Sequence, residues 1–173
     1  MDGNFYPFSF YTIRARINCK IVFERMRNMI KNTKMIQFRD ITDVHNQTRP
    51  MGHLTPIESN GDVPFDINRV YYMTRVPENT TRGFHSHREL EQVLICLNGT
   101  VDIVVSTPYE KETITLKDPS KGLYIGPMVW REMKDFSAGS VLMVLASKHY
   151  DEKDYIRDYD QYIKEAKEYF KGE

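Results

Sequence analysis

The strongest constraint on the fold is a series of short segments, rich in apolar and β-branched residues, that begins at Met35. Segments of this length and composition, bounded by glycine, proline, asparagine or aspartate, are typical of β-strands. Helical periodicity does not interrupt the series before His149, and many short strands without intervening helices predict a closed barrel or a sandwich. The predicted strands are Met35–Phe38, Leu54–Glu58, Arg69–Met73, Gln92–Leu97, Val101–Val105, Thr113–Leu116, Gly122–Ile125 and Val141–Ala146.

One turn signal is sharper than the others. Asn98-Gly99 lies between the apolar segments VLICL and TVDIVV. Both residue types tolerate the positive φ angles of a type I′ turn, so this dipeptide predicts a tight hairpin that joins two adjacent strands.

The sequence pattern changes after His149. In residues 151–173 apolar positions recur every three or four residues, which predicts a C-terminal α-helix with Asp151 as its N-cap. The apolar stripe is expected to pack against the core or to form a dimer contact. Its members are Tyr155, Tyr159, Tyr162, Ala166 and Tyr169.

Residues 1–34 differ in composition from the rest of the chain. They hold seven basic residues against two acidic ones and an amphipathic isoleucine pattern. This basic N-terminal extension is compatible with a transit-like segment, with a surface helix, or with an extension ahead of a start at Met29 or Met35. The expected organisation is therefore an extension over 1–34, a barrel over 35–150 and a helix over 151–173.

The overall charge excludes some partners. Lysine plus arginine equals aspartate plus glutamate, 24 against 24, so no net field favours nucleic acid or a membrane surface. The two cysteines, Cys19 and Cys96, form no disulfide framework or CxxC motif, and no apolar stretch is long enough for a membrane helix. We expect a cytoplasmic protein with neither nucleic-acid nor membrane partners.

Residues 81–92, TRGFHSHRELEQ, carry the candidate chemistry. Because alternate residues of a strand share a face, His85 and His87 point the same way, and Glu91 continues the same parity. That parity extends through Val93, Ile95 and Leu97, so the segment predicts a polar cluster at one end of an apolar barrel interior if no irregularity intervenes.

This segment resembles the first motif of the cupin proteins, and GLYIGPMVWREM resembles the second. In metal-binding cupins the resemblance would make His85, His87 and Glu91 metal ligands, joined by a histidine of the second motif. No histidine occurs near Trp130 and Arg131. Two imidazoles and a carboxylate can still hold zinc or iron(II), but Arg131 in the same interior repels a cation and suits an anionic or carbonyl-bearing ligand. We therefore expect neither a metal nor a cofactor.

Four strings carry a closer resemblance: RVYYM, RGFHSHRELEQVLICLNG, GLYIGPMVWREMKDFS and VLMVLASKHYDEKDYIRDYDQY. In this order they are similar to the nucleotide-sugar 3,4-ketoisomerases, metal-free cupins that act on dTDP-4-keto-6-deoxy-D-glucose. The resemblance implies an all-β jelly-roll barrel, a homodimer, and transfer of the hexose carbonyl from C4 to C3. The 3-keto product would supply the biosynthesis of 3-amino-3,6-dideoxy sugars for lipopolysaccharide or other glycans.

The residues present suit this chemistry. Moving a ketone along a sugar through an enediol requires an acid/base group with a pKa near 7, which is the range of histidine. We assign His85 as the proton shuttle and His87 as its partner, which contacts the sugar oxygens. The resemblance places Tyr71 near the sugar, where its hydroxyl can donate to an enolate oxygen.

Substrate binding is assigned to charged residues. Arg82 and Arg69 are candidates for the diphosphate because the arginine fork matches phosphate oxygens. Either can instead be an exposed charge, and for Arg69 this is the better interpretation. Glu91 and Arg131 are placed at the sugar, and Arg88 is expected to be a solvated charge on the outer face.

Family members with arginine at the position of Arg131 lean to the gluco-configured product, and those with histidine lean to galacto. Arg131 thus predicts an equatorial C4 hydroxyl. A second position linked to this choice reads Met51 in Met51-Gly52-His53-Leu54, which matches neither pattern.

Two other functions fit the same residues. One is a dTDP-sugar 3,5-epimerase, a related metal-free cupin with a histidine base, which the strings RGFHSH and WREM match less well. The other is a non-catalytic sugar-binding cupin.

Overall fold

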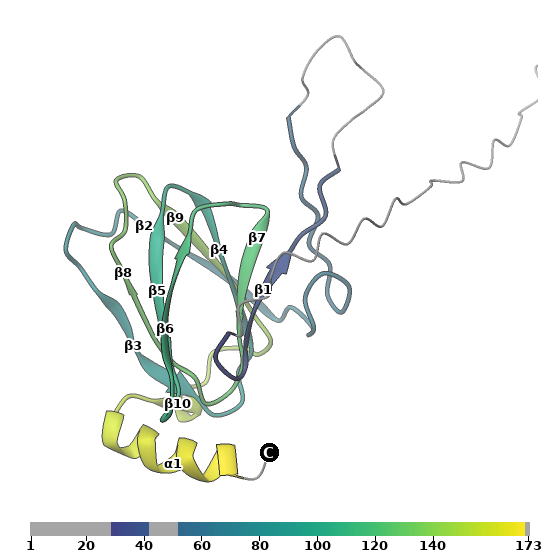
Figure 1. The fold of residues 1–173 in the computed structure, drawn as a ribbon. Coiled ribbons are helices and arrows are strands. Elements are labelled where there is room, and N and C mark those ends of the chain that lie inside the picture. The colour runs from purple at the N-terminus through teal and green to yellow at the C-terminus, as the bar shows by residue number, and fades with distance from the viewer. Residues whose placement is uncertain (1–28, 42–51, 172–173) are drawn as a thin grey trace, which may run out of the picture.

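The computed structural model describes residues 29–41 and 52–171 of the chain, and they form a barrel of two antiparallel five-stranded sheets with a C-terminal helix (Figure 1). The strand orders are β1-β7-β4-β9-β2 and β10-β3-β8-β5-β6. The cupin jelly-roll prediction is confirmed. The elements are β1 Thr33–Gln37, β2 Arg69–Thr74, β3 Arg82–His87, β4 Gln92–Asn98, β5 Val101–Ser106, β6 Lys111–Leu116, β7 Lys121–Ile125, β8 Trp130–Lys134, β9 Val141–Ala146, the 3₁₀ turn η1 Glu152–Asp154, β10 Tyr155–Ile156 and α1 Tyr159–Lys171.

The core lies between the two sheets. Leu94 and Cys96 of β4 contribute from one sheet, and Ile103 and Val105 of β5 contribute from the other. Alternate residues of both sheets interdigitate in this way in sandwiches and small barrels, and their burial supplies most of the driving force for folding.

A second apolar layer covers the outer face of the first sheet. Val93 and Ile95 of β4 are fully buried there against Phe38, Val63 and Phe65 of the connecting segments. β4 is therefore buried on both faces. The parity prediction for this strand was wrong, because Val93 and Ile95 face outward and Leu94 faces the barrel interior.

The predicted hairpin at Asn98-Gly99 was also wrong, since β4 and β5 lie in different sheets. Of the two residues only Gly99 has a positive φ, of 75°. A Cβ on Gly99 would lie 2.4 Å from the Ser137 Oγ, and Asn98 donates to the Gly139 carbonyl at 2.8 Å. The dipeptide thus carries the chain from one sheet to the other, in close contact with the β8–β9 connection.

The C-terminal helix begins later than predicted. Asp151 caps η1 by accepting from the Lys153 N–H, whereas Asp158 accepts from the Gln161 N–H at 2.7 Å and caps α1. Tyr155 lies in β10, because backbone pairing of this strand with β3 replaces helical hydrogen bonds there. The packing of the apolar stripe is confirmed for Tyr162, Ala166 and Tyr169, which lie in one cluster with Trp130. Tyr159 is exposed, and Tyr155 is not part of the helix.

Two further differences concern strands. Leu54–Glu58 is not a strand; the chain turns at Glu58, whose carbonyl accepts from three following N–H groups, and Ile57 packs on the outer apolar layer. β8 was not among the predicted strands, because three of its five residues are charged and its two apolar residues, Trp130 and Met133, do not alternate.

Part of the predicted N-terminal extension belongs to the barrel. Ile30 is buried in the core, and Asn32 donates to the Pro127 carbonyl at 3.0 Å. Residues 1–28 lie outside the described residues. Within the described ranges no helix is long and apolar enough to cross a membrane.

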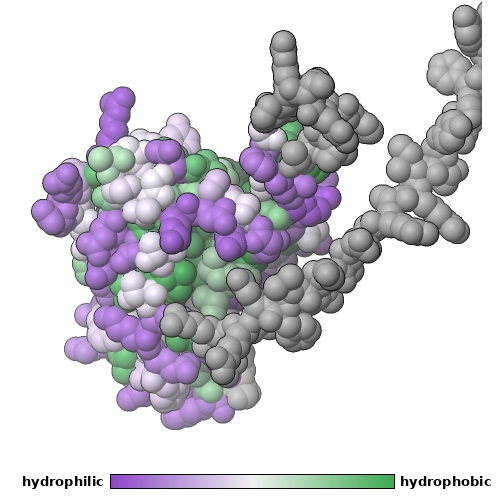
Figure 2. All heavy atoms as spheres, turned by 45° about the horizontal axis from the view of Figure 1, so that its top comes forward, coloured by the Kyte–Doolittle hydropathy of each residue, from purple (hydrophilic) through white to green (hydrophobic). Residues whose placement is uncertain are grey.

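The two ends of the barrel differ in what they carry. Figure 2 brings the end opposite α1 forward, and polar side chains cover much of this face with apolar patches between them. The candidate histidines lie toward the other end, where His87 pairs with Tyr155 of β10 beside α1.

Candidate active site

Polar side chains from both sheets meet at one end of the barrel interior. Strand pairing places His85 of β3 beside Arg131 of β8, and His87 beside Tyr155 of β10. Across the interior, Gln92 of β4 donates to the Tyr71 hydroxyl of β2 at 2.8 Å. The site is therefore assembled from five strands, β2, β3, β4, β8 and β10, that belong to both sheets.

A β-bulge sets the direction of His85. The register of β3 shifts between Gly83 and His85, where Gly83 has a φ of 95° and Phe84 a φ of 53°. A Cβ on Gly83 would lie 2.7 Å from the Arg131 carbonyl oxygen, so only glycine fits this close approach. Bulges of this kind re-aim side chains next to functional sites.

His85 has the geometry of a neutral base. Its Nδ1–H donates to the Gly83 carbonyl at 3.0 Å, since a carbonyl can only accept. In the neutral ring this leaves an unprotonated Nε2. Burial, followed by the charge of Arg131, lowers the pKa of His85 to about 4, so the ring is neutral at pH 7 and can accept a proton.

His87 is more deeply enclosed, with only 1 % of its surface exposed. Its Nδ1 lies 2.9 Å from a carboxylate oxygen of Asp154, while its Nε2 has no hydrogen-bond partner. Burial, then Arg131, lowers the pKa of His87 well below its ordinary range. The centroids of the two histidine rings lie 4.9 Å apart in a T-shaped arrangement, so the rings are in contact with each other.

Arg131 is the largest fully buried side chain of the described residues. Its three guanidinium nitrogens have no hydrogen-bond partner in the structure. Burial lowers the pKa of Arg131 to about 10, which still leaves the group charged at pH 7. An unpaired buried cation is costly, and it favours a ligand that brings hydrogen-bond acceptors or negative charge.

Tyr71 stays protonated in this setting. Burial is the main cause that raises the pKa of the Tyr71 hydroxyl. The Arg69 guanidinium lies over the Tyr71 ring at 5.3 Å and over the Tyr150 ring at 5.7 Å. Tyr71 can therefore act as a donor toward a ligand oxygen beside a positive charge.

Two adjoining cavities open at this end of the barrel. The larger has a volume of about 430 Å³ and contains His85, and the smaller has a volume of about 400 Å³ and reaches His87 and Asp154. Arg69, Tyr150 and Tyr155 line both. The wall of the larger cavity consists of Arg69, Tyr71, Met73, Arg82, Gly83, His85, Met133, Tyr150, Tyr155 and Arg157.

The structure brings together most of the predicted site residues. His85, Tyr71, Arg69 and Arg82 line the larger cavity. Arg131 pairs with His85 across β3 and β8, and its charge lowers the pKa of both histidines. His87 is buried behind them, and its Nε2 is fully enclosed.

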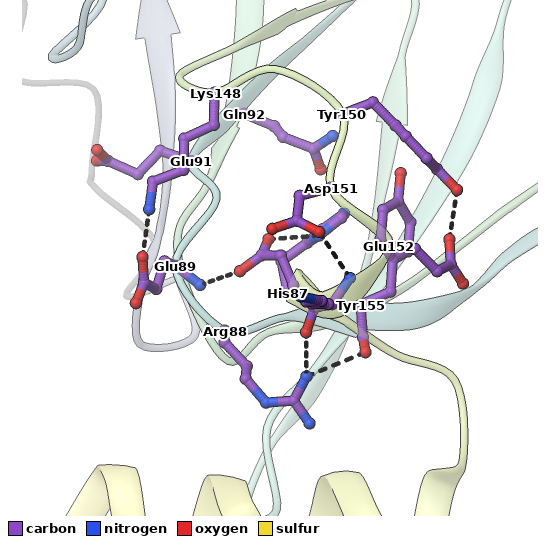
Figure 3. A network of polar contacts seen from close by, with 12 residues as sticks. His87, Arg88, Glu89, Glu91, Gln92, Lys148, Tyr150, Asp151, Glu152 and Tyr155 are labelled. Carbon is purple, nitrogen blue, oxygen red and sulfur yellow. Dashed lines mark hydrogen bonds and ion pairs between the residues drawn. The ribbon is translucent and has the colours of Figure 1, made fainter.

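Glu91 is not part of this cluster. Its carboxylate accepts from the Tyr124 hydroxyl at 2.6 Å, and in Figure 3 it points away from the neighbouring Gln92 amide. The chain crosses from one sheet to the other between β3 and β4, which breaks the parity assumed from the sequence. The placement of Glu91 gives no support to a role in substrate binding. In the described part of the chain, no three histidine, cysteine or acidic side chains are grouped closely enough to hold a metal ion.

Arg88 is not the solvated charge that was expected. It forms a bidentate ion pair with Glu165 of α1. It also donates to the carbonyls of Lys153 and Tyr155 (Figure 3). It therefore ties the helix and the η1 turn to the end of β3.

Sequence reasoning missed several residues of this region: Gln92, Tyr150, Asp154, Tyr155 and Arg157. Four of them lie in the string VLMVLASKHYDEKDYIRDYDQY that carried the family resemblance. That string was a signal of their importance, but the helical pattern assigned to it concealed where Tyr155 points.

A small antiparallel barrel with a cationic, tyrosine-lined cavity at one end defines a class, the cupin barrels with a ligand cavity at the mouth of the barrel. The chain matches the family described as FdtA: WxcM-like, C-terminal, over residues 31–167.

The relatives are consistent with this class. The chain is 48% identical over 131 residues to the TDP-4-oxo-6-deoxy-alpha-D-glucose-3,4-oxoisomerase of Aneurinibacillus thermoaerophilus, covering 76% of this chain and 90% of the relative. The structure of QdtA, a sugar 3,4-ketoisomerase from Thermoanaerobacterium thermosaccharolyticum in complex with TDP, matches with a TM-score of 0.76 and 59% identity, covering 82% of this chain and 99% of that one. The TDP-quinovose 3,4-ketoisomerase WlaRB from Campylobacter jejuni matches with a TM-score of 0.71 and 47% identity, covering 78% and 99%.

The chain belongs to the FdtA, WxcM-like family. This confirms the resemblance to the nucleotide-sugar 3,4-ketoisomerases and the prediction of an enzyme of the isomerase class.

Proposed function

We propose that this protein is a dTDP-sugar 3,4-ketoisomerase that converts dTDP-4-keto-6-deoxy-D-glucose into a dTDP-3-keto-6-deoxyhexose. The observation that carries the proposal is the bulge-directed His85, a neutral base in a cavity of about 430 Å³ that is lined by Arg69, Arg82 and Tyr71. The names of the relatives support the same reaction.

The reaction needs two proton relocations and no change in electron count. His85 Nε2 takes the proton from C3, and the electrons of that C–H bond form a C3=C4 double bond as the C4 carbonyl becomes an enolate. The proton is then returned to C4, and the C3 carbonyl forms as the C3 hydroxyl loses its proton. The oxygen at C4 gains a proton, for which we assign the Tyr71 hydroxyl as the donor, and the proton that leaves the C3 hydroxyl restores the Tyr71 phenol.

The charges of the cavity suit a nucleoside diphosphate. Arg69 and Arg82 line the cavity with guanidinium groups that can bind phosphate oxygens in bidentate fashion. Arg157 also lines it, but it is paired with Glu152 at 2.9 Å, so its charge is partly neutralised. Bound phosphate charge would favour the protonated form of His85, which the proton-abstraction step creates.

The finer points of the proposal rest on the family resemblance. Arg131 favours the gluco product, and the second position linked to this choice, Met51, lies outside the described residues. We also propose that the enzyme is a cytoplasmic homodimer, and that it supplies the synthesis of 3-amino-3,6-dideoxy sugars, because a C3 ketone is the group that amination at C3 requires.

The test is incubation of the protein with dTDP-4-keto-6-deoxyglucose in heavy water, followed by NMR of the sugar. A ketoisomerase gives a 3-keto product that carries deuterium at C4. In a second reaction in ordinary water, the coupling between the C4 and C5 protons of the product reports gluco or galacto configuration. A 3,5-epimerase would exchange C3 and C5 while the ketone stays at C4, and a binding protein would exchange neither position. A parallel reaction with a chelator is expected to proceed at the same rate. Loss of activity that zinc or iron restores would contradict a metal-free mechanism.

A further inference from the structure

Asp154 holds His87 from the side opposite the barrel interior. One carboxylate oxygen of Asp154 lies 2.9 Å from His87 Nδ1, and the other accepts from the Glu89 N–H at 2.8 Å. The Asp154 carbonyl also accepts from the Arg88 N–H at 3.0 Å. With 14 % of its side chain exposed, Asp154 is fixed at both oxygens and anchored to the end of β3.

These contacts determine which nitrogen of His87 carries the proton. An ionised carboxylate can only accept, so the proton of the neutral ring lies on Nδ1 and the Nε2 is a bare acceptor. This Nε2 is enclosed and without a partner, and so are the three guanidinium nitrogens of Arg131. A proton on His87 Nε2 would place the positive end of an N–H dipole in the region that already holds the buried Arg131 cation.

We propose that Asp154 is a positioning residue for proton transfer at His85. It holds His87 as the Nδ1–H tautomer, so that a lone pair and not an N–H is presented inside the barrel end that holds Arg131 and His85. The proposal deepens the ketoisomerase assignment and rests on it.

The effect on catalysis follows from the ring contacts. The His85 and His87 rings are 4.9 Å apart, and the Tyr155 ring lies 4.2 Å from His87 and 5.0 Å from His85. When His85 takes the C3 proton it becomes a cation within this cluster. A neutral His87 with a bare Nε2 and a carboxylate behind it stabilises that cation, whereas an Nε2–H would oppose it.

The variant Asp154→Asn separates this role from packing. Its side-chain oxygen can still accept from the Glu89 N–H, but its amide N–H₂ now faces His87 Nδ1, which must accept and leave the proton on Nε2. We expect the kcat of the ketoisomerase reaction to fall by roughly 10- to 100-fold, as for other partners that orient a reacting group. KM should stay within about twofold, because the lost interaction acts in the transition state.

The direct readout is ¹⁵N NMR of histidine-labelled full-length protein, which needs no substrate. In the wild type the His87 Nδ1 should show the shift of a protonated ring nitrogen and Nε2 that of an unprotonated one, and Asp154→Asn should exchange them. Asp154→Glu, which keeps a carboxylate, should recover part of kcat and the wild-type tautomer. The matched control is Asp158→Asn, which changes the same groups four residues away at the cap of α1 and should alter neither measurement.

The outcomes distinguish this inference from the proposed function. If the wild-type protein forms no 3-keto product, the proposed function fails, while the NMR spectra still test the tautomer. If the wild-type His87 carries its proton on Nε2, or if Asp154→Asn turns over the substrate like Asp158→Asn, the positioning role of Asp154 is overturned.

Discussion

The barrel interior has an apolar half and a polar half, and burial of side chains has opposite effects on stability in the two. In the apolar half, Ile103, Leu123 and Leu142 are fully buried in a cluster of apolar side chains, so their burial stabilises the fold. In the polar half, Arg131 and His87 are just as deeply buried but keep nitrogens without partners. Burial of such groups costs free energy, so the polar half lowers the stability of the fold. The same unpaired nitrogens favour the binding of a ligand that supplies the missing hydrogen bonds.

The largest effect is expected where the polar half meets the cavity. His85→Asn should lower turnover of dTDP-4-keto-6-deoxyglucose by roughly 10²- to 10⁴-fold, which is the usual contribution of a positioned acid/base group. The binding of dTDP, measured by calorimetry, should remain close to wild type, because we assign the diphosphate to arginines and not to the imidazole. His53→Asn, at an exposed histidine that contacts Asp40, is the control. If His85→Asn keeps turnover within about tenfold of wild type, the base lies elsewhere.

The second prediction compares the halves directly by stability. Leu123→Ala removes carbon from the apolar half and should lower the free energy of unfolding by about 2–5 kcal/mol. Arg131→Met removes a buried unpaired cation and should leave that free energy unchanged or raise it by up to about 4 kcal/mol, while turnover falls. Urea unfolding of the two variants gives both values. A loss of stability in Arg131→Met as large as that of Leu123→Ala would show that Arg131 serves packing.

The sequence predicted the apolar half better than the polar one, and the reason is physical. Short β-branched segments between turns indicate a barrel because the period of a strand is local. The spacing His85-x-His87 identified the strand that carries the proposed base. However, the contact between His87 and Asp154, and the pairing of Tyr155 with His87, join segments far apart in the chain. No local pattern encodes such a register.

Two errors had the same origin. The parity from His87 to Glu91 failed, and the hairpin at Asn98-Gly99 failed, because in both places the chain passes from one sheet to the other. Alternation holds within a strand and gives no information across a crossover. A barrel of two sheets contains several such crossovers, so faces predicted for one strand cannot be extended to the next.

The third prediction concerns the pH dependence of the free energy of unfolding, to which the buried histidines of the polar half contribute. The pKa of His85 is lowered from an ordinary 6.5 to about 4 in the folded protein, and that of His87 is also lowered. Between pH 6.5 and about 4 the unfolded chain therefore binds more protons than the folded one, so stability should be lost as the pH falls through this window. Urea unfolding at pH 7 and pH 5 measures the loss, and His85→Asn should reduce the difference between the two. An equal difference in the variant would assign the pH effect to other groups.

The smallest effects are expected for Glu91 and Gln92, which lie at the border of the polar half. Glu91 and Gln92 are neighbours in sequence, but Glu91 contacts Tyr124 on the outer side and Gln92 donates to the Tyr71 hydroxyl inside the barrel. Gln92→Leu removes that hydrogen bond of about 1 kcal/mol and should lower kcat roughly fivefold. Glu91→Gln keeps an acceptor for Tyr124 and should change kcat and KM by less than about twofold, as expected for a residue outside the site. If instead Glu91→Gln lowers turnover as much as Gln92→Leu does, the substrate reaches past β4 to its outer face. The site would then extend beyond the polar half of the barrel interior and include residues on the outer face of the sheet.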